Sequence, residues 1–510
     1  MSRSRRRALV CAAYLGTFLV SLDISIVNVA LPTLQTQLHT DMAGLQWVVN
    51  AYAIALSAFM LSAGPLGDRY GHKPVWAMSV ALFTFGSEVC ASANGLAPLL
   101  VGRTIQGIAG ALLLPSAMPI LTHAFPDRHE RARVIGGWSA FSALALVLGP
   151  LLGGLLVEHV GWQSIFLVNL PIGMVALVLG LWGIPSSKGH RDAVFDPAGQ
   201  ALSVIWLGAL TYGLIQLGDP GADAARTAIC LGLAVVALLV FIWVERRVAR
   251  PLVPLAFLRD PHMRMANIAS LVLGFSGYTC LFLLSLFLQQ AQAQSPAVTG
   301  WQLMPQFFMM GVVSLGFGHI ARRMSVPPLM VAGYAAIGVS MCAMAVFSFD
   351  TPFWLVGLLS GLLGIGMGLS VPATGVTVMA LAPVERAGMA SSMMSALRQS
   401  GMTMGIALLG SVMSLRATHR LTGIATAHGV AQPDELARLA VTAHDLPPGD
   451  GWLPLAYRVA MAHGFSVAML CGGVACTVMA VVLHRHAKRH GEAASGARLG
   501  TAPATGSAGD

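Results

Sequence analysis

Three ionisable residues, Asp23, Arg103 and Arg398, lie inside apolar stretches long enough to span a bilayer. A charged group at the centre of a bilayer costs about 2.5–3.5 kcal/mol on insertion scales, so each of the three calls for a physical reason. A carboxylate is stabilised in its charged form beside an arginine, and separation of the two favours the protonated acid. These residue types are therefore typical of proton coupling, and the alternative is a static ion pair that only stabilises the fold.

The positions of Asp23 and Arg103 predict that they meet. Asp23 lies about seven residues from the outer end of the apolar stretch 8–30, and Arg103 about six residues from the outer end of the stretch 97–121. At 1.5 Å per residue, both lie roughly 10 Å below the outer surface. Glu88 has a similar depth, but nothing beside it in the sequence marks a cavity. We interpret Glu88 as a protonated or outer-edge carboxyl and keep it as a possible extra acid.

The composition requires a membrane around these residues. Of the 510 residues, 56% are hydrophobic and 10% are charged, whereas a soluble protein carries about 25% charged residues. The apolar content suffices for a dozen or more spans of about 20 residues each. The seven cysteines form no CxxC pair and lie in apolar stretches, which excludes a disulfide framework and a zinc site. The sequence therefore predicts an all-α polytopic membrane protein without metal or cofactor.

Apolar runs separated by charged or Gly/Pro-rich breaks predict about fourteen transmembrane helices. They lie near 8–30, 46–66, 75–94, 97–121, 134–157, 163–183, 199–217, 226–245, 266–288, 301–320, 327–348, 353–380, 389–413 and 464–483. The first carries Asp23 and no cleavage site follows it, so we interpret it as a retained span rather than a signal peptide.

The distribution of basic residues predicts the orientation of these spans. With both termini in the cytoplasm, the inner segments hold 23 of the 30 Lys and Arg residues and the outer loops hold five. This asymmetry follows the positive-inside rule and explains the net charge of +9 without a nucleic-acid partner. We expect a multi-pass protein of the cytoplasmic (inner) membrane, in contact with lipid.

Glycines repeat at an offset of 252 residues, which brings Gly149 onto Gly401 and Gly153 onto Gly405. This repeat predicts two homologous six-helix halves with two inserted spans between them, as internal repeats in transporters do. The predicted boundaries are 1–185 for the N-terminal half, 186–265 for the inserted spans with an inner linker, 266–490 for the C-terminal half, and 491–510 for a disordered cytoplasmic tail. The outer segment 414–463 is expected to hold one surface helix near Pro433.

Four stretches carry a resemblance to a known family. The run from Leu22 to Pro32, LDISIVNVALP, is similar to the first-span signature of the fourteen-span drug:proton antiporters of the major facilitator superfamily. The loop GPLGDRYGHK from Gly64 to Lys73 resembles the superfamily's cytoplasmic motif A, RTIQG from Arg103 resembles motif B, and GPLLGG from Gly149 resembles the antiporter motif C. The second-half copy of the loop motif, 316–323, departs from the pattern because it has no acid.

The resemblance implies a conformational role for the loop motif. Gly64, Asp68, Arg69, Gly71 and Lys73 would form a latch, and glycine at 67 and 71 permits a tight turn between helices. A helix N-terminus favours a carboxylate. We therefore expect Asp68 to dock near residues 386–391 when the transporter faces outward and to release when it opens inward. The alternative is a solvated positive-inside loop.

The resemblance also implies a hinge and a substrate cavity. Gly149, Pro150, Gly153 and Gly154 allow close helix packing and a bend, because the glycines admit a neighbouring backbone and the proline removes one hydrogen bond. The polar residues expected to line the substrate cavity are Asn28, Gln106, Arg398 and Gln399. For Arg398, an arginine neutralised by helix carbonyls is the alternative.

No phosphate-binding loop is present to supply energy from ATP, since Lys73, Lys188 and Lys488 precede neither serine nor threonine. The leading hypothesis is proton-driven export of amphipathic drugs or antibiotics by alternating access, with Asp23 taking the proton and Arg103 as its charge partner. The alternatives are a dedicated exporter of one metabolite or antibiotic, a channel, and a polytopic membrane enzyme. No acid pair or His/Cys cluster in the spans supports an enzyme. Participation of accessory export proteins is left open.

Overall fold

A computed structural model describes residues 2–186, 196–219, 221–248, 255–383, 387–443 and 451–499 of the chain. All regular secondary structure in these ranges is helical, which confirms the predicted all-α fold. The first ten helices are α1 (Arg3–Gln37), α2 (Met42–Met60), α3 (Ala63–Tyr70), α4 (His72–Ala91), α5 (Leu96–Ala124), α6 (Arg128–His159), α7 (Ser164–Leu167), α8 (Asn169–Gly183), α9 (Pro197–Gln216) and α10 (Ala224–Glu245).

The second part of the chain begins with the 3-10 turn η1 (Leu255–Arg259) and continues with one span that contains two π-helical turns. This span runs through α11 (Pro261–Leu273), η2 (Gly274–Tyr278), α12 (Thr279–Leu286) and η3 (Phe287–Ala291). The remaining elements are α13 (Pro296–Arg323), α14 (Val326–Met344), α15 (Phe353–Leu381), α16 (Ala387–Ala427), α17 (Pro433–Arg438), the π turn η5 (Leu439–Ala443) and α18 (Leu453–Leu499).

Thirteen helical segments of the described ranges are long and apolar enough to cross a membrane. They correspond to thirteen of the fourteen predicted spans. The other predicted span lies in α16, which is 41 residues long but less apolar, since it carries Arg398 and Gln399 among several serines. The chain is a multi-pass membrane protein.

Aspartates begin several of these helices. The side chains of Asp41, Asp196, Asp223 and Asp260 accept hydrogen bonds from the first free backbone N–H groups of α2, α9, α10 and α11. An N-cap of this kind satisfies donors that have no partner inside the helix. Proline at the first position, in α9 and α11, adds a backbone angle already suited to a helix.

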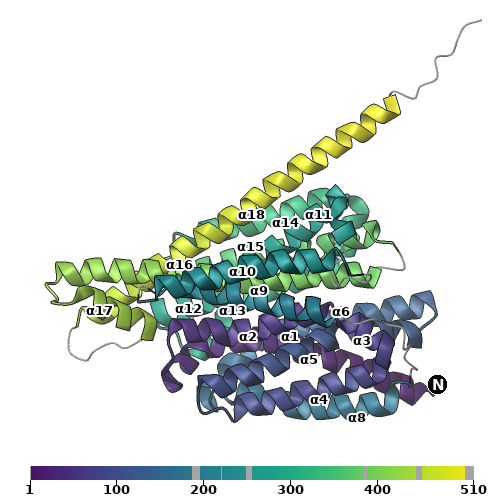
Figure 1. The fold of residues 1–510 in the computed structure, drawn as a ribbon, viewed down its shortest axis with the longest axis horizontal. Helices are drawn as coiled ribbons and strands as arrows, with labels where there is room; N and C mark the ends of the chain where they lie inside the picture. The colour runs from purple at the N-terminus through teal and green to yellow at the C-terminus, as the bar shows by residue number, and fades with distance from the viewer. Residues whose placement is uncertain are drawn as a thin grey trace, which may run out of the picture.

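The bundle has two ends, which Figure 1 shows at the right and left of the view. The N-terminus and α3 lie at one end, which we call the inner end after the predicted orientation. The surface helix α17 lies at the opposite, outer end, where the predicted helix near Pro433 is confirmed. Beside it, the Arg438 guanidinium lowers the pKa of the Glu435 carboxyl by hydrogen bonding and by its charge.

Three helices extend farthest beyond the predicted apolar limits. Helix α1 continues to Gln37 and α16 continues to Ala427, both past the outer end of their apolar stretch. Helix α18 continues to Leu499, into the segment predicted as a disordered tail, and residues 500–510 lie outside the described ranges. Hydrophobicity marks where a helix leaves the bilayer, whereas alanine, glutamate and arginine have enough helix propensity to prolong it in water.

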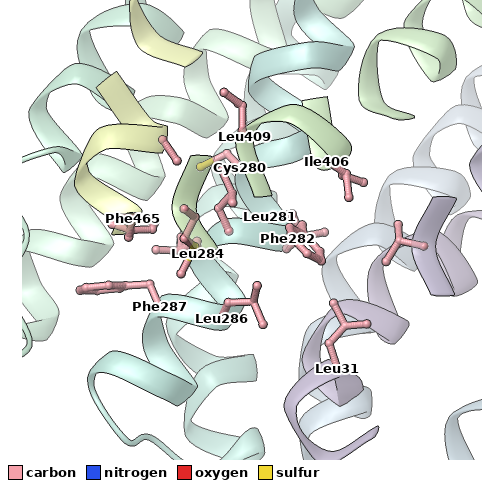
Figure 2. Close-up of a cluster of buried hydrophobic side chains, with 14 of the residues drawn as sticks. Leu31, Cys280, Leu281, Phe282, Leu284, Leu286, Phe287, Ile406, Leu409 and Phe465 are labelled. Carbon is pink, nitrogen blue, oxygen red and sulfur yellow. The ribbon is translucent and has the colours of Figure 1, made fainter. Parts of the chain in front are cut away.

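The first six predicted spans (α1–α8) and the last six (α11–α18), here called the two halves, meet in an apolar core. Leu31 of α1 and Phe282 of α12 are both completely buried there. Figure 2 shows Leu31 facing Phe282 and Leu286, with Ile406 of α16 close by. Toward α18, the rings of Phe287 and Phe465 stack with their centroids 4.4 Å apart.

The two inserted spans attach to this bundle through α9. This helix packs on α2 of the first half and on α16 of the second. The Trp47 and Tyr212 rings meet at 6.3 Å, and Ser411 donates a hydrogen bond to the Leu214 carbonyl. Helix α10 packs on α9 and turns most of its apolar side chains outward, as a lipid-facing span does.

Candidate functional site

Asp23 and Arg103 meet inside the first half, as their similar predicted depths allowed. Nη1 of Arg103 donates to Oδ2 of Asp23 at 2.5 Å, and the two side chains are 0–1% exposed. Asp23 lies fourteen residues before the end of α1 (37 − 23) because this helix extends to Gln37. Within the described ranges, Asp23 is the one acid buried inside a long apolar helix rather than at its end.

Gln106 joins this ion pair, one turn along α5 from Arg103. Its Nε2 donates to Oδ1 of Asp23 at 3.0 Å and to the Ser87 hydroxyl at 2.8 Å, and its Oε1 accepts from Arg103 at 2.9 Å. The Asn169 amide of α8 also donates to Ser87, at 3.3 Å. Both oxygens of Asp23 therefore accept hydrogen bonds. Gln106 was expected to line the substrate cavity; in this arrangement its side chain is fully buried in the network, and its place in the cavity stays a prediction.

The Arg103 guanidinium also has partners other than Asp23. Its Nε donates to the Val48 carbonyl of α2 at 3.1 Å, and its Cζ lies 4.3 Å from the centre of the Tyr52 ring. A buried ion needs such additional contacts, since desolvation can exceed the attraction between two opposite charges. The Tyr52 hydroxyl has no hydrogen-bond partner among the described residues. The site is a compact, water-excluded network of one acid, one arginine and neutral polar groups.

Close helix approaches bring these side chains together. A Cβ atom at Gly86 of α4 would lie 3.0 Å from the backbone nitrogen of Gln106, and one at Gly107 would lie 2.5 Å from the Tyr52 carbonyl oxygen. Only glycine lets α5 pack this closely on α4 and α2. The RTIQG segment therefore combines two hydrogen-bonding side chains, Arg103 and Gln106, with Gly107, which lets α5 pack closely on α2.

The predicted hinge segment of α6 packs against the helix that carries Asp23. A Cβ atom at Gly149 would collide with the Ser25 side chain, and one at Gly153 would lie 2.9 Å from the Ile26 carbonyl oxygen. On another side, Gly154 lies against the Pro296 backbone of α13, and the Pro150 carbonyl lies against Gly300. Motif C thus contacts α1 two to three residues from Asp23 and also reaches the second half.

Helices α1 and α6 hydrogen-bond to the second half only at the outer end, within the described ranges. Ser285 donates to the Asn28 carbonyl at 2.7 Å, and Gln290 donates to Gln35 at 2.7 Å. From α6, Glu158 accepts from the Ala297 backbone N–H at 3.0 Å. The Asn28 side-chain amide donates to a carbonyl of its own helix. Because its backbone carbonyl accepts from Ser285, Asn28 lies at the seam between the halves.

A second seam between the halves runs along α2 and α16. The Ser57 hydroxyl lies 2.6 Å from that of Ser400 and donates to the Ala396 carbonyl at 2.9 Å. Gln46, nearer the outer end of α2, lies beside Gly410. The contact between these two helices therefore extends along both inner and outer parts of the bundle.

The loop motif at the inner end forms the predicted tight turn. Gly71 joins α3 to α4 with φ at +92°, a conformation that favours glycine. Lys73 donates to the Leu181 carbonyl near the end of α8 at 2.7 Å, a contact within the first half, and Arg69 is exposed beside Tyr70. The surroundings of Gly64 and of the Asp68 side chain lie outside the part of the chain that the structure describes, as do residues 384–386. The latch therefore stays a prediction.

The other expected lining residues lie on α16. The Arg398 guanidinium lies over the Tyr278 ring of η2 at 5.6 Å, and Gln399 is 8% exposed. Separately, an apolar groove of about 780 Å³ lies between α13 and α15, lined by Trp301, Phe308 and neighbours. These aromatic side chains are more than half exposed, so the groove faces the lipid rather than the centre of the bundle.

Sequence reasoning missed Ser87, which directly precedes Glu88, the residue kept as a possible extra acid. Glu88 is exposed near the outer end of α4, whereas Ser87 is fully buried in the network around Asp23. Successive residues on a helix point about 100° apart, so depth alone does not distinguish them. The sequence spacing could have identified Ser87, because it lies on the same helix face of α4 as Phe83 and Cys90, and all three side chains are buried. No group of three or more His, Cys, Asp or Glu residues that would hold a metal occurs in the described ranges.

Comparison with known proteins identifies the kind of molecule that this network belongs to. A family model described as Major Facilitator Superfamily matches residues 13–406. The chain is 37% identical over 414 residues to "Multidrug resistance protein Stp" of Mycobacterium tuberculosis (strain CDC 1551 / Oshkosh), which covers 81% of this chain and 77% of that protein.

Two antibiotic resistance proteins show a comparable similarity. "Methylenomycin A resistance protein" of Bacillus subtilis (strain 168) is 32% identical, covering 79% of this chain and 87% of its own length. "Tetracenomycin C resistance and export protein" of Streptomyces glaucescens is 33% identical, covering 81% of this chain and 77% of its own.

A solved structure shares the fold at low sequence identity. The crystal structure of a bacterial homolog to the human lysosomal transporter Spinster, in an inward-facing and unoccupied conformation, superposes with a TM-score of 0.66 and 17% identity. The alignment covers 96% of this chain and 98% of that one. This likeness concerns the arrangement of the helices.

Proposed function

The chain belongs to the Major Facilitator Superfamily, and from this premise we propose that it exports amphipathic drugs or antibiotics across the cytoplasmic membrane in exchange for protons. The family and the solved neighbour are transporters rather than enzymes, which removes the polytopic enzyme from the alternatives. The relatives are named multidrug or antibiotic resistance proteins, which supports drug efflux.

The observation that carries proton coupling is the buried acid of α1. Asp23 is fully buried in this arrangement and accepts hydrogen bonds from Arg103 and Gln106. A shift of α5 relative to α1 would remove these donors, and an unpaired carboxylate in a low-dielectric interior takes up a proton. Protonation in turn weakens the attraction between α1 and α5. Asp23 is the coupling residue in this proposal, and Arg103 is its charge partner.

Energy from the proton gradient is sufficient for export. One proton that enters across 100 mV releases about 2.3 kcal/mol, and each pH unit adds about 1.4 kcal/mol. Proton and substrate would favour states that face opposite sides of the membrane. The substrate site itself would lie between the halves near Arg398 and Gln399, on the side away from the lipid.

Motif C connects the coupling site to this movement. Gly149 and Gly153 pack on α1 beside Asp23, while Gly154 packs on α13. A small rotation of α1 would therefore be passed to the contact between α6 and the second half. We also propose that the chain divides into halves 1–185 and 266–490 with the insert 186–265, and that both termini lie in the cytoplasm. The latch of Asp68 belongs to the same transport cycle in this proposal.

The inter-half hydrogen bonds of α1 and α6 at the outer end support a state closed to the outside. The bonds from Ser285 to Asn28 and from Ala297 to Glu158 would have to break for substrate to leave. Each such bond contributes about 0.5–1.5 kcal/mol, so the outer closure can open at a moderate cost.

Efflux from intact cells tests the proposal. Cells that express the wild type should expel several compounds of an antibiotic and dye panel, and a protonophore should stop this efflux. Asp23→Asn should abolish it, whereas Glu88→Gln, an exposed acid of similar depth, serves as the matched control and should not. Export of a single compound favours the dedicated exporter. Efflux that persists with the protonophore rejects proton coupling.

A further inference from the structure

A group of basic side chains without acidic partners lies at the outer end of α16 and α18. Arg416, His419 and Arg420 lie on consecutive turns of α16, and all three are exposed. Positive side chains three and four residues apart on a helix repel one another. In the described ranges neither arginine forms an ion pair, and Glu435 of the outer segment pairs with Arg438.

A fourth basic residue faces this group from α18. His463 is exposed on α18, next to Gly464. The backbones of α16 and α18 are in contact at this level, because Gly464 lies against the Met413 carbonyl. A Cβ atom added at Gly464 would lie 3.1 Å from the Ala417 methyl. The four basic residues therefore form one surface, which we call the outer basic site.

The exposed face of α18 places the outer basic site at the membrane surface. Between His463 and His484 this face carries no charged side chain, and Leu470, Val474 and Val478 on it are between 48% and 55% exposed. His463 and His484 are 21 residues apart, or roughly 32 Å along the helix. The hydrocarbon core of a bilayer is about 30 Å thick. His463 thus lies where the outer headgroups begin.

We propose that Arg416, His419, Arg420 and His463 bind the phosphate of an anionic phospholipid in the outer leaflet, with an acyl chain along Leu470 and Val474. Arginine forms two parallel hydrogen bonds to phosphate oxygens, and the two imidazoles add donors when protonated. An anion at this point removes the repulsion between Arg416 and Arg420. The acyl chain covers an apolar face that the protein itself leaves open.

Native mass spectrometry of the delipidated full-length protein tests this site with phosphatidylglycerol as the probe. The Arg416→Gln/Arg420→Gln variant should bind this lipid about thirtyfold more weakly, from about fivefold for each arginine near a charged lipid surface. Arg226→Gln, an exposed arginine at the outer end of α10, is the matched control and should bind as the wild type does. Phosphatidylcholine and inorganic phosphate are titrated in parallel.

Further readouts separate a lost site from a damaged fold. Arg416→Lys/Arg420→Lys keeps the charges but not the paired hydrogen bonds, and its affinity should lie between those of the wild type and the glutamine variant. Thermal stabilisation by phosphatidylglycerol should be present in the wild type and in this lysine variant and absent in the glutamine variant. Unchanged lipid binding by the glutamine variant, equal binding of phosphatidylcholine, or equally tight binding of free phosphate would overturn the proposal. None of these outcomes depends on transport.

Discussion

The Asp23→Asn variant should lower the free energy of unfolding by about 3–5 kcal/mol, because it leaves the Arg103 charge buried without a counter-ion. Arg103 is 1% exposed, so water cannot replace the lost carboxylate. The two carboxylate oxygens accept from Arg103 and from Gln106. Asparagine keeps one acceptor but turns the other into an amino group, which then faces a donor.

The double variant Asp23→Asn/Arg103→Gln should recover most of this loss, because no buried charge is left. Arg103→Gln alone should cost less than Asp23→Asn, since an unpaired carboxylate can take up a proton whereas arginine cannot lose one. The assay is denaturant unfolding of the purified protein in micelles, arranged as a double-mutant cycle. We expect a coupling energy of at least about 2 kcal/mol. Losses that add within about 0.5 kcal/mol would refute the interaction.

Two further predictions concern residues around this pair. Gly153→Leu should slow transport far more than it lowers expression, because its side chain meets the Ile26 carbonyl of α1; an unchanged efflux rate at normal expression would exclude the hinge role. Ser87→Ala should destabilise the protein by about 1 kcal/mol through the lost hydrogen bond from Gln106, whereas Glu88→Gln should change stability by less than about 0.5 kcal/mol. Equal effects of the two substitutions in thermal unfolding would contradict the assigned helix faces.

The sequence was sufficient to predict the contact between Asp23 and Arg103. Charges are so rare inside membrane spans that depth and opposite sign leave few pairings, and each span has a nearly fixed rise per residue. The tight turn at Gly71 was also predictable, since a positive φ favours glycine. These predictions rest on the cost of a charge inside a membrane, the rise of a helix and the backbone freedom of glycine.

Neutral polar residues were harder to place than charges. Gln106 was expected in the substrate cavity, yet its side chain completes the ion-pair network. Asn28 was expected there too; its amide bonds to its own helix and its carbonyl accepts from Ser285 across the seam, so its place in the cavity stays a prediction. Uncharged amides carry a small burial cost and accept many partners, so only the helix rotation decides where they point. The outer ends of α1 and α16 were missed for a different reason, because hydropathy does not register a helix that continues into water.

Proton release from acid-loaded inside-out vesicles is the measurement that tests the central claim most directly. Addition of a transported compound to wild-type vesicles should discharge the pH gradient, because each exported molecule exchanges for a proton taken up at Asp23. Asp23→Asn vesicles should show no discharge at equal protein content, and Glu88→Gln vesicles should behave as the wild type does. Proton exchange that persists in Asp23→Asn would contradict the account and place the coupling site elsewhere.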